Sequence, residues 1–276
     1  MIRRLAFIID PQNMFMTLPG MPLPVFGADQ DMLRVAVRLL LYPFYYDEIV
    51  VTLDTHTEDH IGHPGRWLND QGQQPLPFTV ITSAEYEAGK WCAADPADQV
   101  WQGDYLRLLE ATGRVHTVWP VHGRKGHFEH KVYKPLKAAL DTWERITGKK
   151  VRYIEKGMHR DTEQFGVFGA NVPITGASET EINMELLGEV NSFDATHYFG
   201  EASSHCAKDS VTQNLAHIPE VDFSKYTVFR DCMSPVAAVV DEKTGDVIVD
   251  FPAQAEAWFH ELQAKGVNVV KAEDYF

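Results

Sequence analysis

Short apolar runs alternate with segments of helical periodicity along this chain. Leu5–Ile9 and Glu48–Leu53 are apolar runs that each close on an aspartate, as buried parallel strands with a polar carboxyl end do. Between them, Asp31–Leu41 carries apolar side chains at helical spacing, with Asp29 or Asp31 as a candidate N-cap. Two buried strands with a helix between them form a βαβ unit, so the pattern predicts a parallel sheet.

The same alternation continues through the rest of the chain. Further strands are expected at Val115–Trp119, Lys150–Ile154, Ala195–Phe199, Tyr226–Arg230 and Val267–Val270. Helices are expected at Asp104–Ala111, Pro135–Ile146, from the capping box Ser178–Glu181 to about Val190, from Cys206 to about His217, and at Ala253–Lys265. This order predicts one doubly wound, Rossmann-like α/β domain over residues 1–276, with about six mainly parallel strands and helices on both faces.

Two segments depart from that alternation. Residues from about 62 to 103 are rich in Gly, Pro, Gln and Asp and show no sustained period. Because they are longer than a plain connection in a compact domain, we predict a functional insertion that covers the site or forms a subunit contact. Residues from about 236 to 251 contain two apolar runs around Lys243–Asp246, which predicts an added hairpin.

Composition, charge and the absence of certain motifs disfavour several kinds of partner, location and cofactor. The chain carries a formal net charge of −14, which disfavours nucleic acid and anionic membranes. Three cysteines do not suggest a disulfide framework, so we expect a reducing, cytoplasmic location. We expect neither a membrane span nor a signal peptide, because the apolar stretches are too short. Neither G-x-G-x-x-G after a strand nor G-x-x-x-x-G-K-S/T occurs, so we expect no nucleotide cofactor.

One cysteine stands at a position that suits chemistry. Tyr198–Cys206 has the pattern of a strand end, a turn of small residues and the first turn of a helix. Cys206 would then lie against the unpaired N–H groups and the positive dipole end of that helix, which favours a thiolate. The same N–H groups can hold a developing oxyanion. A lone cysteine is more often buried and inert, so its neighbours decide between these readings.

Two ionisable residues follow other predicted strands: Asp10 and Lys156. A parallel sheet gathers the carboxyl ends of its strands along one edge, where ligands bind. We expect Asp10, Lys156 and Cys206 to meet there, since a carboxylate can take a thiol proton and an ammonium stabilises a thiolate. Taken singly, Asp10 could equally cap a loop and Lys156 could be a surface charge.

A second cluster is rich in histidine and predicts a metal site. Asp54 and His56 stand two residues apart in an extended segment and point the same way, so both can bind one ion. His122 follows the next predicted strand and is the candidate third ligand, while His60 is a candidate fourth. Carboxylate and imidazole suit one divalent metal, zinc first, with iron or manganese as alternatives. An exposed His-rich turn would give the same pattern. Two nearby histidines are expected to be solvated: His127 and His130.

Five segments carry motifs that occur together in one family. Phe7–Phe15 contains D-x-Q-N-x-F, Asp54–His60 reads D-x-H-x-x-x-H, Trp119–His122 reads W-P-x-H, Tyr153–Gly157 contains a lysine at a strand end, and Ala202–Cys206 is similar to A-T-D-H-C. In this order, they resemble the motifs of the isochorismatase-like cysteine hydrolases, and of their nicotinamidase branch in particular. Each match is modest by itself, but the common order over almost two hundred residues makes the resemblance specific.

The resemblance implies a Rossmann-like α/β fold and hydrolysis of a carbon–nitrogen bond in a small amide through a cysteine thioester. It implies that Asp10 is the proton acceptor, Lys156 its charged neighbour and Cys206 the nucleophile. The N–H groups of Ala202 and Cys206 would form the oxyanion hole, next to a cis peptide bond between Glu201 and Ala202.

The same resemblance implies the surroundings of the substrate. Asp54, His56 and His122 would bind the metal, whereas family members differ on the role of His60. The remaining metal positions would hold waters and the ring nitrogen of the substrate. Two aromatic residues would sandwich a flat ring, although each could equally belong to the core: Phe15 and Trp119.

The leading prediction is therefore a metal-dependent amidase that hydrolyses nicotinamide to nicotinate and ammonia. The alternative is a related amidohydrolase for another small amide, of carbamoyl, ureido or maleamate type, which the long insertion, Pro11 and Ser204 suggest because they depart from the family pattern. A non-catalytic binding protein on the same fold is less favoured, and so is isochorismate hydrolysis, since those relatives lack the cysteine. The expected partner is a small-molecule amide, and a homo-oligomer is left open.

Overall fold

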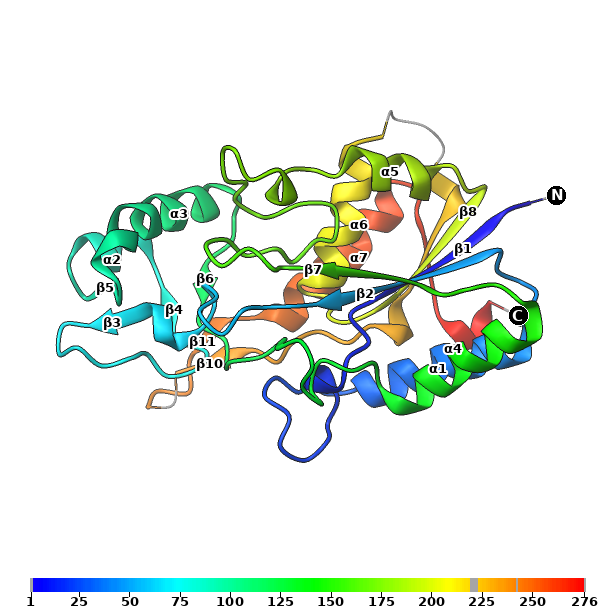
Figure 1. Ribbon diagram of the computed structural model, residues 1–276, viewed down its shortest axis with the longest axis horizontal. Helices are drawn as coiled ribbons and strands as arrows, with labels where there is room; N and C mark the ends of the chain where they lie inside the picture. The colour runs from blue at the N-terminus through cyan, green and yellow to red at the C-terminus, as the bar shows by residue number, and fades with distance from the viewer. Residues whose placement is uncertain (1, 219–222, 242, 276) are drawn as a thin grey trace.

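The computed structural model describes residues 2–218, 223–241 and 243–275, and its centre is a six-stranded parallel sheet. The strands lie in the order β12-β9-β8-β1-β2-β7 (Figure 1). Their bounds are Arg4–Ile9 for β1, Glu48–Asp54 for β2, Arg152–Lys156 for β7, Ala195–Gly200 for β8, Tyr226–Phe229 for β9 and Asn268–Val270 for β12. All five neighbouring pairs are parallel, and the predicted doubly wound α/β fold is thereby confirmed.

Helices cover both faces of this sheet, because each face of its inner strands is apolar. Along β1, Ala6 and Ile8 contribute to one core together with two helices, α1 (Ala28–Leu41) and α4 (Lys134–Thr147). Leu5, Phe7 and Ile9 contribute to the opposite core. The helices on that side are α5 (Met184–Asn191), α6 (Cys206–Ala216) and α7 (Phe251–Ala264) (Figure 1). Burial on both faces explains why the strands are continuous apolar runs rather than alternating ones.

A separate group of short elements extends from the carboxyl side of the sheet. It comprises β3 (Trp67–Asn69), β4 (Val80–Ile81), α2 (Ser83–Glu87), β5 (Trp91–Ala93), α3 (Gln99–Ala111) and β6 (His116–Thr117). β3 pairs antiparallel with β5, and β4 with β6. A third apolar cluster around Trp67, Tyr105 and Leu106 holds them together. The hairpin β10 (Val239–Val240) and β11 (Val247–Val249) lies beside this group (Figure 1).

Two predicted elements were wrong. The strand expected at Val115–Trp119 is the two-residue β6, which pairs with β4 outside the central sheet, because β7 takes the edge of β2. Ser178–Thr180 forms a 3-10 turn instead of opening a helix. The helix α5 begins later, at Met184, and its N-cap is Asn183, whose side chain accepts a hydrogen bond from Leu186 N.

At α1 the N-cap is Gly27, not an aspartate. Asp29 accepts hydrogen bonds from Thr17 instead, and Asp31 accepts one from Ser234. The helix expected from Asp104 begins five residues earlier, at Gln99, after a 3-10 turn that the Asp95 side chain caps. No helix of the described residues is both long and apolar enough to cross a membrane.

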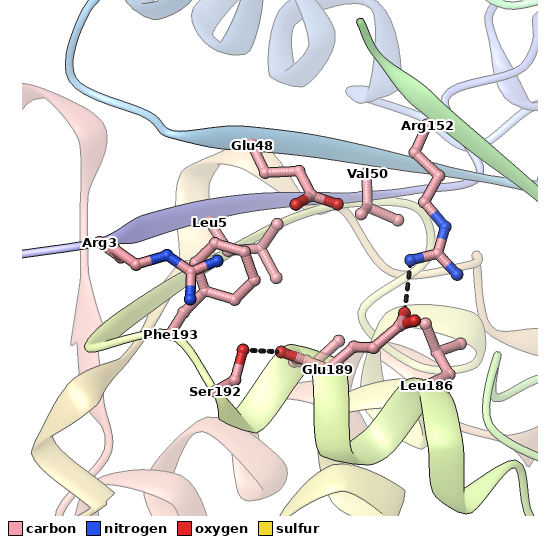
Figure 2. Close-up of a pocket in the computed structure, with 10 residues that line it drawn as sticks. Arg3, Leu5, Glu48, Val50, Arg152, Leu186, Glu189, Ser192 and Phe193 are labelled. Carbon is pink, nitrogen blue, oxygen red and sulfur yellow. Dashed lines mark hydrogen bonds and ion pairs between the residues drawn. The ribbon is translucent and has the colours of Figure 1, made fainter. Parts of the chain in front are cut away.

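A pocket lies at the amino ends of the strands, at the edge of the sheet opposite Asp10, Asp54 and Lys156. There Arg152 pairs with Glu189 of α5, and the Arg3 guanidinium lies 4.4 Å from the ring centre of Phe193 (Figure 2). No candidate catalytic or metal-binding residue lines this pocket. The predicted site residues all belong to the other edge, where the strands end.

We expect Trp143→Ala to lower the free energy of unfolding by about 3–5 kcal/mol. Trp143 of α4 is 1% exposed, packs in the core shared with α1, and its Nε1 donates to Pro43 O at 2.8 Å. The change would leave both a cavity and an unpaired carbonyl. Urea unfolding followed by circular dichroism measures the loss. Lys137→Ala, at an exposed position of the same helix, is the control and should change stability by less than about 0.5 kcal/mol.

Candidate active site

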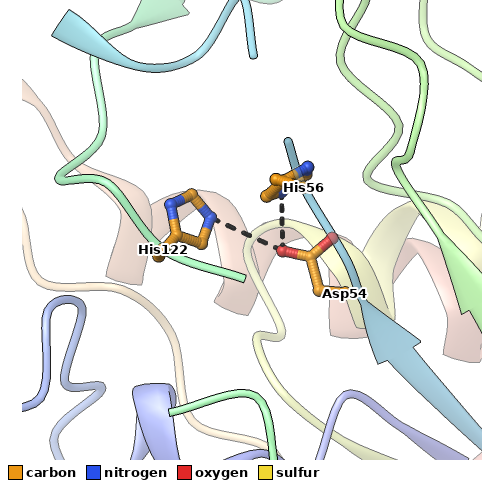
Figure 3. Close-up of side chains that lie close together, drawn as sticks. All are labelled: Asp54, His56 and His122. Carbon is orange, nitrogen blue, oxygen red and sulfur yellow. Dashed lines mark hydrogen bonds and ion pairs between the residues drawn. The ribbon is translucent and has the colours of Figure 1, made fainter. Parts of the chain in front are cut away.

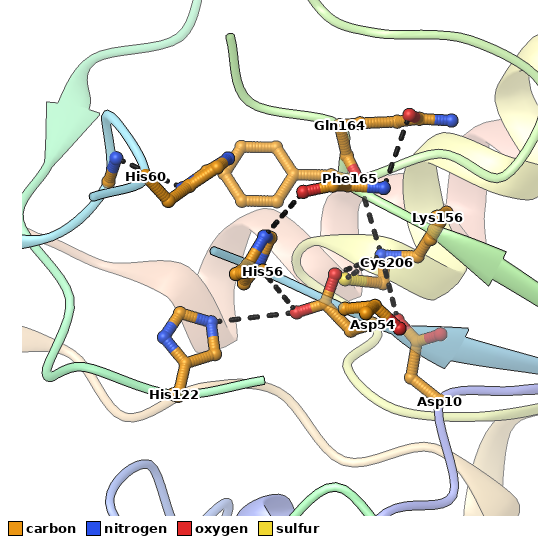
Figure 4. Close-up of polar contacts among 12 residues, drawn as sticks. Asp10, Asp54, His56, His60, His122, Lys156, Gln164, Phe165 and Cys206 are labelled. Atoms are coloured by element: carbon orange, nitrogen blue, oxygen red, sulfur yellow. Dashed lines mark hydrogen bonds and ion pairs between the residues drawn. The ribbon is translucent and has the colours of Figure 1, made fainter. Parts of the chain in front are cut away.

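Four neighbouring elements of the sheet bring the predicted catalytic residues together. Asp10 follows β1, Lys156 ends β7 and Cys206 opens α6, directly after the turn that follows β8. Lys156 Nζ lies 3.0 Å from Asp10 Oδ2 and 3.5 Å from Cys206 Sγ (Figure 4). It also lies 2.7 Å from Oδ1 of Asp54, the last residue of β2. All four side chains are buried, so residues far apart in the sequence share one dry cluster.

The Lys156 ammonium is charged because of this cluster. Burial by itself lowers the pKa of Lys156, but Asp10, Asp54 and Cys206 outweigh that effect and raise the pKa well above its ordinary value. Burial raises the pKa of Asp54 as well, yet His56 and Lys156 hold that pKa well below its usual range. A fixed ammonium and a fixed carboxylate therefore stand beside the thiol.

The pKa of the Cys206 thiol is higher than the thiolate expected from the sequence would require. Burial raises the pKa of Cys206 well above its ordinary value; Lys156 opposes this, while Asp10 and Asp54 add to it. Desolvation therefore opposes the thiolate that the helix end and the ammonium favour. Burial also raises the pKa of Asp10, whose Oδ1 accepts a 2.5 Å hydrogen bond from Thr52 Oγ1. Lys156 Nζ contacts both Asp10 Oδ2 and Cys206 Sγ, so the Asp10 carboxyl group stands near the thiol as a candidate base.

Asp54, His56 and His122 form the one group of three or more His, Cys, Asp or Glu side chains among the described residues that could hold a metal. One ligand atom from each lies within 4.8 Å of the others (Figure 3). Asp54 Oδ2 is 3.0 Å from His56 Nε2 and 3.5 Å from His122 Nε2. All three residues are buried.

Backbone carbonyls orient both imidazoles for metal binding. His56 Nδ1 donates to Gly157 O at 2.8 Å, and His122 Nδ1 donates to Pro120 O at 2.8 Å. Each imidazole thereby turns its Nε2 toward Asp54 Oδ2, where that nitrogen could bind a metal. A backbone carbonyl behind each imidazole is the usual support of metal-binding histidines. The residues fit a divalent metal.

The neighbouring histidines are engaged in other ways. His60 Nδ1 accepts from Gly62 N and its Nε2 donates to Thr162 O, both at 3.1 Å, so neither nitrogen faces the metal group. Its ring lies against that of His56, with centres 4.0 Å apart. His63 Nε2 accepts the backbone N–H of His122 at 3.3 Å. His127 is exposed as expected, whereas His130 is buried and bonds to Thr55 Oγ1 at 2.7 Å.

The pocket beside Cys206 is lined by aromatic and apolar residues and contains one unpaired carboxylate. Both predicted aromatic residues, Phe15 and Trp119, line it. The pocket has further lining residues that the sequence did not single out: Leu23, Glu163, Phe165, His205 and Val236. Glu163 Oε1 is buried and has no hydrogen-bond partner among the described residues, and burial raises the pKa of Glu163 to about 7. This carboxyl group can accept or donate a hydrogen bond to a molecule in the pocket.

The predicted oxyanion segment has the backbone that the resemblance implied. The peptide bond between Glu201 and Ala202 is cis. No described residue accepts a hydrogen bond from the N–H of Ala202 or Cys206, although Ala202 O accepts from Ala207 N at 3.1 Å. Both N–H groups are therefore left for a ligand.

Side chains beneath the segment hold it in place. Glu201 Oε2 accepts from Ser234 N at 3.1 Å, and Ser234 Oγ donates to Asp31 Oδ2 at 2.6 Å. Ser204, which stands where the family has an aspartate, accepts from Val236 N at 3.1 Å and bonds to His205 Nδ1 at 2.8 Å. The departure at Ser204 thus preserves a polar anchor, which connects this turn to the segment before the hairpin.

No protein-family model and no curated protein matches the chain, but solved structures do. The yeast nicotinamidase Pnc1p superposes with a TM-score of 0.62 at 19% identity, covering 97% of this chain and 99% of that one. The pyrazinamidase of Pyrococcus horikoshii in complex with zinc gives 0.55 at 17%, covering 98% and 99%. An isochorismatase family protein from Desulfovibrio vulgaris gives 0.53 at 14%, covering 99% and 96%. The chain therefore has the isochorismatase-like α/β fold that its five motifs indicated.

We expect Gly157→Ala to reduce the divalent metal content of the purified protein several-fold. A Cβ at Gly157 would lie 2.7 Å from His56 Cε1, and one at Gly123, on the other side of the ring, 2.9 Å from His56 Cδ2. The imidazole fills the slot between these glycines and has no room to move aside. Gly89→Ala is the matched control, because Gly89 also has a positive φ but a Cβ there would meet no atom within 4 Å. Elemental analysis after metal loading compares the two variants. Equal metal content would contradict the claim that the lack of a side chain at residue 157 positions His56 for the metal.

We expect Glu201→Gln to gain stability relative to the unchanged protein as the pH rises from 5 to 8. Burial, together with Asp31, raises the pKa of Glu201 well above its ordinary value. The native state then holds a proton that the unfolded chain releases, so this group loses about 1.4 kcal/mol of stability per pH unit between its two pKa values. The amide has no such proton to lose. Chemical unfolding at several pH values measures the difference, and a pH-independent difference would refute this assignment.

Proposed function

We propose that this protein is a metal-dependent cysteine amidohydrolase that hydrolyses nicotinamide to nicotinate and ammonia. The observation that carries the proposal is the contact of one buried ammonium, Lys156, with Asp10, Asp54 and Cys206, directly beside the metal-ligand group. Proteins of the same fold support the choice of substrate: the yeast nicotinamidase Pnc1p is solved bound to the inhibitor nicotinaldehyde, and PnC1 from L. infantum in complex with nicotinate.

The first half of the reaction follows from the proton positions. Asp10 takes the thiol proton of Cys206 as the sulfur attacks the carboxamide carbon, which forms the C–S bond and moves an electron pair onto the carbonyl oxygen. The N–H groups of Ala202 and Cys206 receive this oxyanion. The oxyanion then collapses, the C–N bond breaks, and ammonia leaves with the proton from Asp10. Lys156 remains charged throughout and stabilises the sulfur and the carboxylate.

In the second half, Asp10 removes a proton from water, and the resulting hydroxide attacks the thioester carbon. Collapse of that intermediate releases nicotinate and returns the proton to the sulfur. A positioned general base contributes about 10²–10⁴-fold to the rate, and one oxyanion donor about 10²–10³-fold. Together these proposed roles account for a large acceleration.

Substrate binding divides between the metal and the aromatic walls. Asp54, His56 and His122 would hold one divalent metal, zinc first and iron or manganese as alternatives, which would supply a Lewis acid for the ring nitrogen when bound. Phe15 and Trp119 would lie against the two faces of the ring. Both line the pocket with Cys206, which supports this role over a purely structural one.

The alternatives from the sequence differ in what supports them. Another small amide remains an alternative substrate, because the mouth of the pocket is formed by segments that lie outside the central sheet. A non-catalytic binding protein is less favoured: four buried ionisable groups that contact one another cost desolvation energy, which a mere scaffold has no reason to retain. All three cysteines are free, which fits the reducing, cytoplasmic location that we propose.

We expect the metal-loaded protein to release ammonia from nicotinamide and a chelator to stop the release. Cys206→Ala should abolish turnover, because no other described thiol reaches the carboxamide. Asp54→Ala should lose the metal and mainly weaken substrate binding. Cys92→Ala, at a half-buried cysteine outside the pocket, is the control with unchanged activity. An ammonia assay with elemental analysis of the same samples decides; metal-replete protein that releases no ammonia rules out nicotinamide hydrolysis.

A further inference from the structure

A large apolar groove lies at the mouth of the catalytic pocket, and we call it the outer groove. It encloses about 740 Å³, within the range of small-molecule sites. Its walls come from three parts of the chain: Leu23–Pro24, the segment from Leu76 to Lys90 that includes α2, and Val236–Asp241 together with Ile248 of the hairpin region. The last two walls belong to the segments that depart from the alternating α/β pattern.

The outer groove is continuous with the catalytic pocket. Leu23 and Val236 line both the outer groove and the pocket that contains Cys206. Phe78 of the outer groove also contacts Trp119 of the pocket, with ring centres 6.2 Å apart and planes nearly perpendicular. A molecule bound at Cys206 can therefore extend past these residues into the groove.

The lining of the outer groove is apolar and exposed. Leu76 is 78% exposed, Ile248 54% and Val240 48%. Apolar side chains gathered in this way around a pocket are typical of ligand-binding grooves. Of the three charged residues of the wall, Lys90 Nζ pairs with Glu85 Oε1 at 2.5 Å, while Asp241 Oδ1 accepts from the backbone N–H groups of Lys243 and Thr244. The groove thus suits an uncharged hydrocarbon rather than a charged group.

The backbone of Phe78 gives independent support. Among the described residues, only two other than glycine have a positive φ: Asp10 at 47° and Phe78 at 68°. This conformation is strained for a bulky side chain, and such strain concentrates at active sites and ligand clamps. At Phe78 it places the ring against Trp119, between the outer groove and the catalytic pocket.

From these observations we infer that the preferred substrate is an aromatic primary amide with an apolar substituent, which the outer groove binds. This inference rests on the proposed amidohydrolase function and specifies its substrate class. Unsubstituted nicotinamide would fill only the inner pocket, and the hydrocarbon would add burial of Leu76, Val240 and Ile248. The substituent leaves the reaction itself unchanged, since the carboxamide remains at Cys206.

The test compares nicotinamide with 5- and 6-hexyloxynicotinamide as substrates of the metal-loaded protein. We expect kcat/KM to be at least tenfold higher for one of the hexyloxy amides. Leu76→Ser and Ile248→Ser should each lower that kcat/KM by about tenfold, the order expected when burial of one aliphatic side chain is lost. Both should leave nicotinamide turnover within twofold. Val100→Ser is the matched control: Val100 is 77% exposed, lies on α3 and lines neither pocket.

Three results would each overturn the inference. The first is an equal kcat/KM for all three amides, and the second is an equal loss of kcat/KM for all three amides in the Ser variants. The third is a change in the oligomeric state of the Ser variants, measured by light scattering, which would make the groove an interface between copies of the chain.

A binding experiment separates failure of the groove from failure of the proposed function. If no amide is hydrolysed, calorimetry on metal-loaded Cys206→Ala measures binding of the same three compounds. Tighter binding of a hexyloxy amide that Leu76→Ser weakens supports the groove while the amidohydrolase proposal fails. Equal binding, or none, overturns the groove as well.

Discussion

The buried ammonium of Lys156 is the interaction on which the rest of the site depends. Removing an ammonium from water costs several kcal/mol even after relaxation, so it persists only with close countercharges. Asp10 at 3.0 Å and Asp54 at 2.7 Å supply them. Because these residues stand at the ends of β1, β2 and β7, the cluster holds three adjacent strand ends at one level. Without Lys156, two carboxylates would face each other in a dry site, and neither the base nor the metal group would keep its geometry.

Asp54 connects the two halves of the site. Its Oδ1 contacts Lys156, while its Oδ2 faces the Nε2 atoms of His56 and His122. One carboxylate thus belongs both to the charge cluster around the thiol and to the metal-ligand group. The carbonyls of Gly157 and Pro120 hold the imidazoles from behind. Asp54 therefore links the position of the metal-ligand group to that of the thiol, as the proposed function requires.

The central sheet and the mouth of the catalytic pocket are built from different segments of the chain. The six parallel strands and their helices carry the charge cluster, and the solved nicotinamidases share this architecture. The outer groove comes from the segments around Leu76 and the hairpin, which lie outside the central sheet. Under the proposed function, the mouth would select the substrate while the residues at the strand ends would carry out the reaction.

Continuous apolar runs such as Leu5–Ile9 determined the sheet, because a strand buried on both faces leaves no other pattern, and the small-residue turn before Cys206 marked where α6 begins. The sequence order of ionisable residues at strand ends likewise predicted which of them would meet. Glu163 and Phe165 escaped prediction, since they lie in an irregular connection after β7 without a period to place them. The short pairing of β6 with β4 and the raised pKa of the Cys206 thiol also depended on the tertiary structure. Strand partners and desolvation are properties of what packs around a residue, and a local pattern along the chain does not contain them.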